Sequence, residues 1–212
     1  MPPSPVRLHD AALPEAAFRR LDRRLRALGT ERLKRTYQTT FWFDLGAPSC
    51  IVEEAILALA PCVPAGPELR GVEWWLSRMY TTDVRVDFHQ DRDEQLALAT
   101  GQLVHPLISS VLFLNRVRGG ALAITEDLPE EDSPSLAPSA LDFTLVSPRP
   151  NRFVHFGGTL THGVLDADNQ VPDGKLPGRS RLRRTLVMNW WDRQPRGIPR
   201  FDEAKVYRTL AL

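Results

Sequence analysis

The chain has 212 residues, of which 42% are apolar and 25% charged, and its formal net charge is +1 at neutral pH. These values are ordinary for a soluble globular protein of one large domain, and the small net charge gives no electrostatic argument for a nucleic-acid or membrane partner. No apolar run approaches the ~20 residues of a membrane span, and the start of the chain lacks signal-peptide order, so we expect a cytosolic protein. Two cysteines are too few for a disulfide scaffold.

The first third of the chain predicts helices and one strand. Residues 1–12 are proline-rich and predict an irregular arm. Over residues 13–28, apolar side chains recur at helical spacing and arginines cover the remaining surface, which predicts an amphipathic helix packed on a sheet. Residues 36–45 have strand composition, and residues 51–60 predict a second helix. Because acidic residues elsewhere balance the arginines, we interpret the arginine-rich helix face as solvated.

From residue 72 the sequence predicts short strands almost to its end. The expected strands are 72–80, 84–88, 108–115, 121–124, 143–146, 152–156, 159–165 and 184–191. Two helices followed by such strands predict a mainly β fold, a jelly roll or double-stranded β-helix with the two N-terminal helices packed on its outside. We therefore expect a single domain, 1–212, which consists of an arm (1–12), a helical support (13–71), a β-helix core (72–191) and a C-terminal extension (192–212).

An alternating run in the middle of the chain ends in the sequence His89-x-Asp91. In a strand, residues i and i+2 point to the same face, so the imidazole and the carboxylate converge. An open iron(II) site needs two imidazoles and one carboxylate, so a second histidine should complete it. The candidates are His162 and His155. We favour His162, because Gly163 follows it and permits a close approach near a metal.

Four sequence elements in this order resemble a known family. They are His89-x-Asp91, a Gly119-Gly120 turn leading into residues 121–124, the run Thr161-His162-Gly163-Val164, and Arg184 six residues ahead of Trp190. Together they resemble the iron(II)- and 2-oxoglutarate-dependent dioxygenases, nearest to the prolyl-hydroxylase-like branch. The resemblance covers about residues 74–191.

The resemblance implies a double-stranded β-helix with the metal between its two sheets. It implies that His89, Asp91 and His162 hold Fe(II) and that Arg184 binds the far carboxylate of 2-oxoglutarate. It also implies a chemistry in which O2 and 2-oxoglutarate are co-substrates, succinate and CO2 are released, and an unactivated C–H bond is hydroxylated. Halogenases of the family lack the carboxylate ligand, so Asp91 favours hydroxylation or desaturation.

The arginine assignment depends on the strand register near the end of the chain. Alternation places Arg184 on one face with Leu186, Met188 and Trp190, and a buried arginine is costly unless a carboxylate pairs with it. A dicarboxylate co-substrate supplies that partner through bidentate hydrogen bonds. A shift of one residue would place Arg183 and Thr185 there instead, and this alternative stays open.

The remaining site candidate is Tyr80, which lies nine residues before His89, where related enzymes often place a tyrosine on the co-substrate. The long loops 126–139 and 166–180 are candidates for elements that cover the site.

We expect the substrate to be an amino-acyl or peptide side chain or a small natural-product intermediate, with no nucleic-acid or membrane partner. Two alternatives remain from other classes. One is a cupin-like metalloenzyme that does not use 2-oxoglutarate, and the other is a non-catalytic β-barrel binding module.

Overall fold

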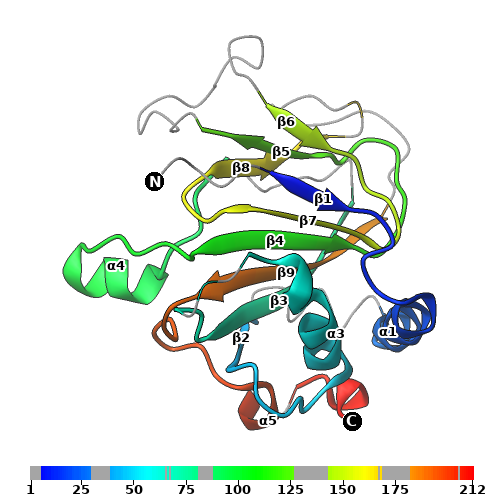
Figure 1. Ribbon diagram of the computed structural model, residues 1–212, viewed down its shortest axis with the longest axis horizontal. Coiled ribbons are helices and arrows are strands. Elements are labelled where there is room, and N and C mark those ends of the chain that lie inside the picture. Colours follow the sequence, from blue (N-terminus) through cyan, green and yellow to red (C-terminus); the bar gives the residue numbers. More distant parts are fainter. Residues whose placement is uncertain are drawn as a thin grey trace.

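Two antiparallel sheets form the centre of the molecule (Figure 1). The computed structural model describes residues 6–29, 39–64, 66, 68–80, 88–126, 143–166, 168, 182–204 and 206–212. The larger sheet has six strands in the order β1-β7-β4-β9-β3-β2. Their bounds, in that order, are Arg7–His9, Arg152–Gly157, Ile108–Phe113, Leu182–Trp191, Gly71–Tyr80 and Phe41–Phe43.

The smaller sheet has three strands in the order β6-β5-β8, with bounds Thr144–Val146, Leu122–Thr125 and Thr161–Val164. A cluster of buried apolar side chains contributed by both sheets fills the space between them; it includes Val111, Phe113, Leu122, Ile124, Val146, Val154 and Phe156. Apolar side chains from two facing sheets bury each other, which is what stabilises a β-sandwich or jelly roll. The predicted mainly β double-stranded β-helix is confirmed.

Helices cover the outer face of the larger sheet, as the sequence predicts. Helix α1 (Glu15–Ala27) and helix α3 (Ile51–Leu59) agree with the two predicted helices. Helix α1 turns Phe18, Leu21 and Leu25 inward, and these side chains join a core that also contains the outer-face residues of β3 and β9. A short 3-10 turn, η1 (Ala60–Cys62), follows α3.

Three segments differ from the sequence-based expectation. Residues 7–9 of the expected irregular arm form β1, which pairs with the edge of β7. The strand expected over residues 36–45 is β2, limited to Phe41–Phe43 within the described part of the chain. A helix that was not predicted, α4 (Glu94–Thr100), follows Asp93, whose carboxylate accepts a hydrogen bond from the Leu96 backbone N–H. Its cap stabilises this helix where little apolar surface is buried.

The C-terminal segment packs back onto the main core. Helix α5 (Phe201–Ala204) and the 3-10 turn η3 (Arg208–Leu210) follow the last strand. Phe201 is 5.5 Å from the ring of Phe41, which is 4.6 Å from that of Trp74 (centroid distances). This aromatic group joins the end of the chain to β2 and β3.

Strand β9 lies near the centre of the larger sheet, and its two faces have different neighbours. Leu186, Met188 and Trp190 join the core beneath the helices, whereas Val187 packs against the cluster between the sheets. Because side chains alternate along a strand, Arg183, Thr185, Val187 and Asn189 share the inner face. This register determines which residues of β9 can reach a site between the sheets.

Among the described residues, no helix is long and apolar enough to cross a membrane.

We expect Leu186→Ala to lower the free energy of unfolding by about 2–5 kcal/mol, because it leaves a cavity where a fully buried side chain of β9 stood. Urea denaturation measures this loss. Leu145→Ala, on a side chain that is 52% exposed, is the matched control and should change the free energy by less than about 0.5 kcal/mol. Equal losses in the two variants would contradict the described packing.

Candidate metal centre

The three predicted metal ligands converge. One potential ligand atom from each of His89, Asp91 and His162 lies within 4.8 Å of the other two. The Nε2 atom of His89 is 3.5 Å from Oδ1 of Asp91, and the Nε2 atom of His162 is 3.3 Å from Oδ2 of Asp91. Two imidazoles and one carboxylate that point at a common space form the donor set that suits a divalent transition metal.

Backbone pairing brings the two histidines together. The His89 N–H donates to the His162 carbonyl at 3.0 Å, and the His162 N–H donates to the His89 carbonyl at 2.9 Å. His162 belongs to β8, so His89 extends the smaller sheet by one paired residue. Directly opposed residues of an antiparallel pair hold their side chains close together, and the two ring centroids are 4.6 Å apart.

Gly163 permits this arrangement, although for a different reason from the one expected. A Cβ atom added at Gly163 would lie 3.1 Å from the ring of Phe88, the residue before His89. Phe88 in turn stacks on Phe143 at a centroid distance of 5.1 Å. The glycine therefore makes room for an aromatic neighbour that positions the first ligand.

Asp91 is tied to the larger sheet. The Ser109 hydroxyl of β4 donates to Oδ2 of Asp91 at 3.1 Å, and Nδ1 of His105 lies 2.8 Å from the Asp91 backbone carbonyl. Burial alone would raise the pKa of the Asp91 carboxyl, but the adjacent imidazoles, first that of His162 and then that of His89, hold this pKa well below its usual range. Asp91 is therefore ionised at neutral pH, which suits its candidate role as a metal ligand.

The orientation of His162 leaves one ring nitrogen for a metal. Its Nδ1 lies 3.1 Å from the carbonyl oxygen of Leu160, which can only accept, so Nδ1 carries the proton and Nε2 faces Asp91. A ligand histidine usually has such a partner, because the hydrogen bond fixes the tautomer and the ring orientation. His162 is 7% exposed, whereas the side chain of His89 is 43% exposed, so the cluster opens to solvent on the His89 side.

His155, the other candidate for the second histidine, lies elsewhere. It is buried on β7, and its ring stacks on His9 of β1 at a centroid distance of 5.5 Å. The residues on either side of it, Val154 and Phe156, point into the space between the sheets. Because side chains alternate along a strand, His155 faces away from that space. Within the described residues, the group of potential ligands contains His162 and not His155.

The structure separates the two candidate arginines. Arg184 lies on the helix-covered face of β9 and forms a salt bridge with Asp22 of α1 at 2.9 Å. Tyr80, at the end of β3, is 38% exposed. It lies two residues after Arg78, so strand alternation places both on that same outer face. Both residues belong to the helix-covered face of the larger sheet, so the strand register does not favour their assignment to the co-substrate, which stays a prediction. Arg184 does share a face with Leu186, Met188 and Trp190, as predicted, but that face packs beneath the helices and not toward the smaller sheet.

Arg183 lies on the inner face instead. Its guanidinium donates to the Gly120 carbonyl at 2.9 Å and lies 5.1 Å from the centroid of the Phe113 ring. Its partner across the sheet is Met79, which packs against Val164, two residues beyond His162. The buried Thr185, predicted as a contact of the co-substrate, lies on the same face, with its hydroxyl 3.5 Å from Nη1 of Arg183.

Two polar residues on the inner face were missed by the sequence analysis. Glu73 of β3 and Asn189 of β9 are direct cross-strand partners, and the Trp191 indole donates to Glu73 at 3.2 Å. Desolvation, together with repulsion from Asp91, raises the pKa of Glu73 to about 7. Each of the two interrupts a run of apolar residues, residues 71–76 in β3 and residues 186–191 in β9, which was the available signal.

Several predicted features lie outside the described residues. They are strand residues 84–87 and most of the two candidate covering loops, residues 127–139 and 169–180.

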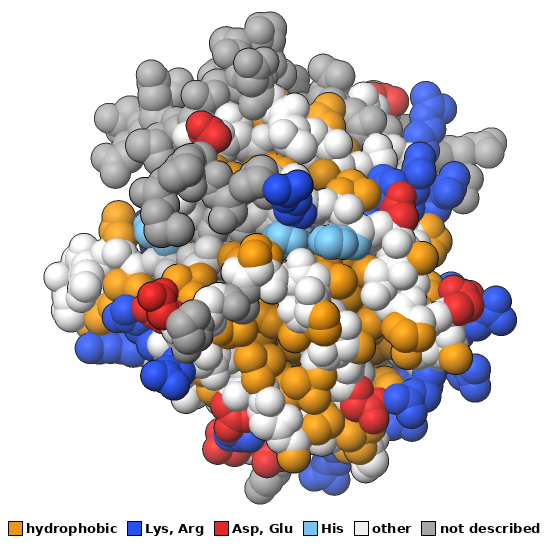
Figure 2. Space-filling view, in the orientation of Figure 1, with side chains coloured by type: hydrophobic (Ala, Val, Ile, Leu, Met, Phe, Trp, Pro, Cys, Tyr) orange, Lys and Arg blue, Asp and Glu red, His pale blue; other side chains and the backbone are white. Residues whose placement is uncertain are grey.

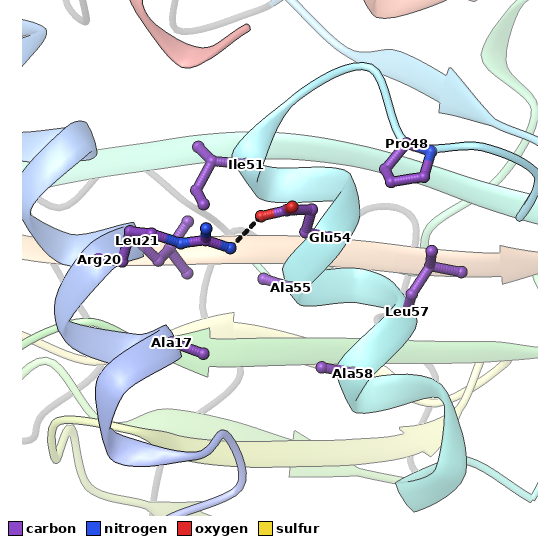
Figure 3. Close-up of a pocket in the computed structure, with 9 residues that line it drawn as sticks. All are labelled: Ala17, Arg20, Leu21, Pro48, Ile51, Glu54, Ala55, Leu57 and Ala58. Carbon is purple, nitrogen blue, oxygen red and sulfur yellow. Dashed lines mark hydrogen bonds and ion pairs between the residues drawn. The ribbon is translucent and has the colours of Figure 1, made fainter. Parts of the chain in front are cut away.

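A hollow between α1 and α3 lies on the other side of the larger sheet from the metal cluster (Figure 3). Ala17 and Leu21 of α1 face Ala55 and Ala58 of α3 across it, and an ion pair between Arg20 and Glu54 spans it. Figure 2 shows hydrophobic side chains gathered over the part of the molecule where α1, α3 and the neighbouring strands lie in Figure 1. This hollow contains none of the three metal-ligand candidates.

Comparison with solved structures identifies the class of fold. A prolyl-4-hydroxylase from Pseudomonas putida matches with a TM-score of 0.54 at 19% identity, over 90% of this chain and 89% of that one. AviO1 from Streptomyces viridochromogenes matches with a TM-score of 0.54 at 16% identity, over 93% and 94%. HygX from Streptomyces hygroscopicus, solved with nickel and 2-oxoglutarate, matches with a TM-score of 0.52 at 16% identity, over 88% and 83%.

No protein-family model and no curated protein sequence matches this chain. The structural matches cover nearly the whole chain and establish a shared fold. The chain therefore has the double-stranded β-helix of the 2-oxoglutarate–Fe(II) oxygenases, with a His-Asp-His group that could hold a metal ion.

We expect His162→Ala to weaken Co(II) binding by more than about 100-fold, because loss of even an outer partner of a metal ligand costs 10–100-fold. Calorimetric titration with Co(II) measures the affinity. His155→Ala is the matched control, since it removes a buried histidine that faces away from the cluster, and it should retain the wild-type affinity. The opposite ranking would transfer the ligand role to His155.

His155 also makes stability depend on pH. Burial, followed by the charges of His9 and Arg7, lowers the pKa of His155 from 6.5 to about 4. Between these values the unfolded chain binds a proton on this residue that the folded chain does not, so the stabilising contribution is present above pH 6.5 and is lost as the pH falls toward 4. We expect the free energy of unfolding to fall more gently over this range in His155→Gln, and an identical slope would contradict the assignment.

Proposed function

We propose that this chain is an Fe(II)- and 2-oxoglutarate-dependent oxygenase that hydroxylates an unactivated C–H bond. The observation that carries the proposal is the convergence of His89, Asp91 and His162 within 4.8 Å at one end of the space between the sheets. Two imidazoles and one carboxylate leave three coordination positions open on an octahedral iron, enough for a chelating co-substrate and O2. HygX, which shares the fold, has been solved with nickel and 2-oxoglutarate bound.

Bound iron would supply the activation of O2, coupled to conversion of 2-oxoglutarate to succinate and CO2. The chain's own residues supply position and charge. His89, Asp91 and His162 would hold the metal, and the Leu160 carbonyl and the Ser109 hydroxyl would keep His162 and Asp91 in their orientations. Retention of the carboxylate at Asp91 supports hydroxylation or desaturation over halogenation.

In this proposal Arg183, and not Arg184, binds the far carboxylate of 2-oxoglutarate. Arg183 is 3% exposed and lies on the inner face of β9, beside Met79 and near the end of the strand that carries His162. A guanidinium can bind a carboxylate with two parallel hydrogen bonds, and the hydroxyl of Thr185, which accepts from Arg183, would be free to donate a third. Arg184 already has a carboxylate partner in Asp22.

The proposed substrate is a small molecule or an amino-acyl or peptide side chain that enters beside His89, where the cluster is open to solvent. The two alternative classes make different predictions for the same variants. A cupin-like metalloenzyme without 2-oxoglutarate would bind metal but would not respond to 2-oxoglutarate, and a non-catalytic module would respond to neither.

Anaerobic titration with Fe(II) and then 2-oxoglutarate tests the proposal. We expect a visible metal-to-ligand charge-transfer band in the intact protein, and an apparent 2-oxoglutarate affinity at least about tenfold weaker in Arg183→Ala, because each hydrogen bond to a charged group contributes about 1.5–3 kcal/mol. Arg184→Ala is the matched control on the neighbouring residue and should keep the wild-type affinity.

Absence of the band in the intact protein would contradict the proposal. A loss of affinity confined to Arg184→Ala would reverse the arginine assignment and leave the oxygenase class in place.

A further inference from the structure

A row of polar side chains leads away from the metal cluster across the larger sheet. Ser109 of β4 pairs with Asn189 of β9, and Asn189 pairs with Glu73 of β3. All three lie on the inner face, and the Ser109 hydroxyl donates to Asp91. Because neighbouring strands are about 4.8 Å apart, Glu73 lies roughly 10 Å from Ser109 along this row. The row therefore begins at Ser109, which is hydrogen-bonded to the candidate ligand Asp91, and ends at the carboxylate of Glu73.

Glu73 is a carboxylate in an unfavourable environment. The groups that most stabilise its charged form, the Trp191 indole and the Asn189 side chain, are both neutral donors. Burial and the negative charges of Asp91 and Asp93 act in the opposite direction and raise the pKa of Glu73. A partly buried charge whose donors, among the described residues, are neutral remains costly, and a cation placed beside it would stabilise it.

Asn189 supplies a second, independent observation. It is 2% exposed, and among the described residues its Oδ1 atom has no hydrogen-bond partner. Its amide N–H group is the one that can donate to Glu73, since a carboxylate accepts, so the carbonyl oxygen is left without a donor. Buried polar atoms are nearly always hydrogen-bonded, and an exception in a site points to a missing ligand group.

We propose that Glu73 and Asn189 form a subsite that recognises a positively charged amine of the substrate. The inference rests on the proposed function, because the subsite is defined by its distance from the proposed iron site. An ammonium group offers one positive charge and three donors, which satisfies both the Glu73 carboxylate and the Asn189 carbonyl oxygen. A hydroxyl offers one donor and no charge, and a carboxylate would be repelled by Glu73. The substrate is then a small amine that carries its oxidised carbon within about 10 Å of the nitrogen.

Binding of paired probes tests the subsite. Each amine is compared with its uncharged analogue of similar size: hexylamine with hexanol, and cadaverine with pentanediol. Binding to the anaerobic protein loaded with Fe(II) and 2-oxoglutarate is followed by the change in the charge-transfer band and by calorimetry. We expect the amines to bind at least about tenfold more tightly than their partners, as a charge-assisted hydrogen bond allows.

Glu73→Gln should abolish this preference, because it removes the charge and keeps the shape of the side chain. The matched control is Glu53→Gln, which changes a buried glutamate that accepts hydrogen bonds from Ser49 at the start of α3. It should keep the preference. Asn189→Leu removes the unpartnered acceptor, should also weaken amine binding, and serves if Glu73→Gln does not fold.

The outcomes separate the subsite from the oxygenase proposal. If the band forms but no amine is preferred, or if the preference survives both Glu73→Gln and Asn189→Leu, the subsite is overturned and the oxygenase proposal stands. If the band does not form, the oxygenase proposal fails, and calorimetry of the same probe pairs on the metal-free protein still decides whether Glu73 selects amines.

Discussion

The candidate metal site depends on two backbone hydrogen bonds between His89 and His162. They place one histidine on β8 and the other directly beside it, so both imidazoles belong to the smaller sheet. Asp91 instead accepts a hydrogen bond from the Ser109 hydroxyl of the larger sheet. The three ligands can therefore converge only if the two sheets keep a fixed separation. The apolar cluster between the sheets sets that separation, which couples the geometry of the site to the packing of the core.

Strand β9 serves both layers of the molecule because its side chains alternate. Its outer face supplies core residues beneath the helices, and its inner face supplies polar groups to the space between the sheets. Arg183 and Arg184 are neighbours in sequence but have different surroundings. Arg184 is neutralised by Asp22, while Arg183 lies among Phe113, Gly120 and Thr185. A shift of one residue in the pairing of β9 would exchange these roles.

The inner face is unusually polar near the metal cluster. Asp91 and Glu73 both lie there, and the buried Oδ1 atom of Asn189 has no hydrogen-bond partner among the described residues. Such groups destabilise an apolar core, and proteins retain them where a bound metal or ligand compensates. Iron would balance Asp91, and a substrate amine would balance Glu73 and bond to Asn189. The cost in stability and the proposed binding function are thus two consequences of the same residues.

The sequence by itself determined the elements whose signals are local. Helical spacing located α1 and α3, alternation and composition located most of the strands, and the His89-x-Asp91 spacing with His162-Gly163 identified the convergent ligands. Tertiary structure alone decided the rest. The choice between Arg183 and Arg184 depends on which face of β9 meets the smaller sheet, and Glu73 meets Asn189 only through strand pairing. These contacts join residues that are distant in sequence. A single sequence does not determine which residues of two such strands lie opposite each other.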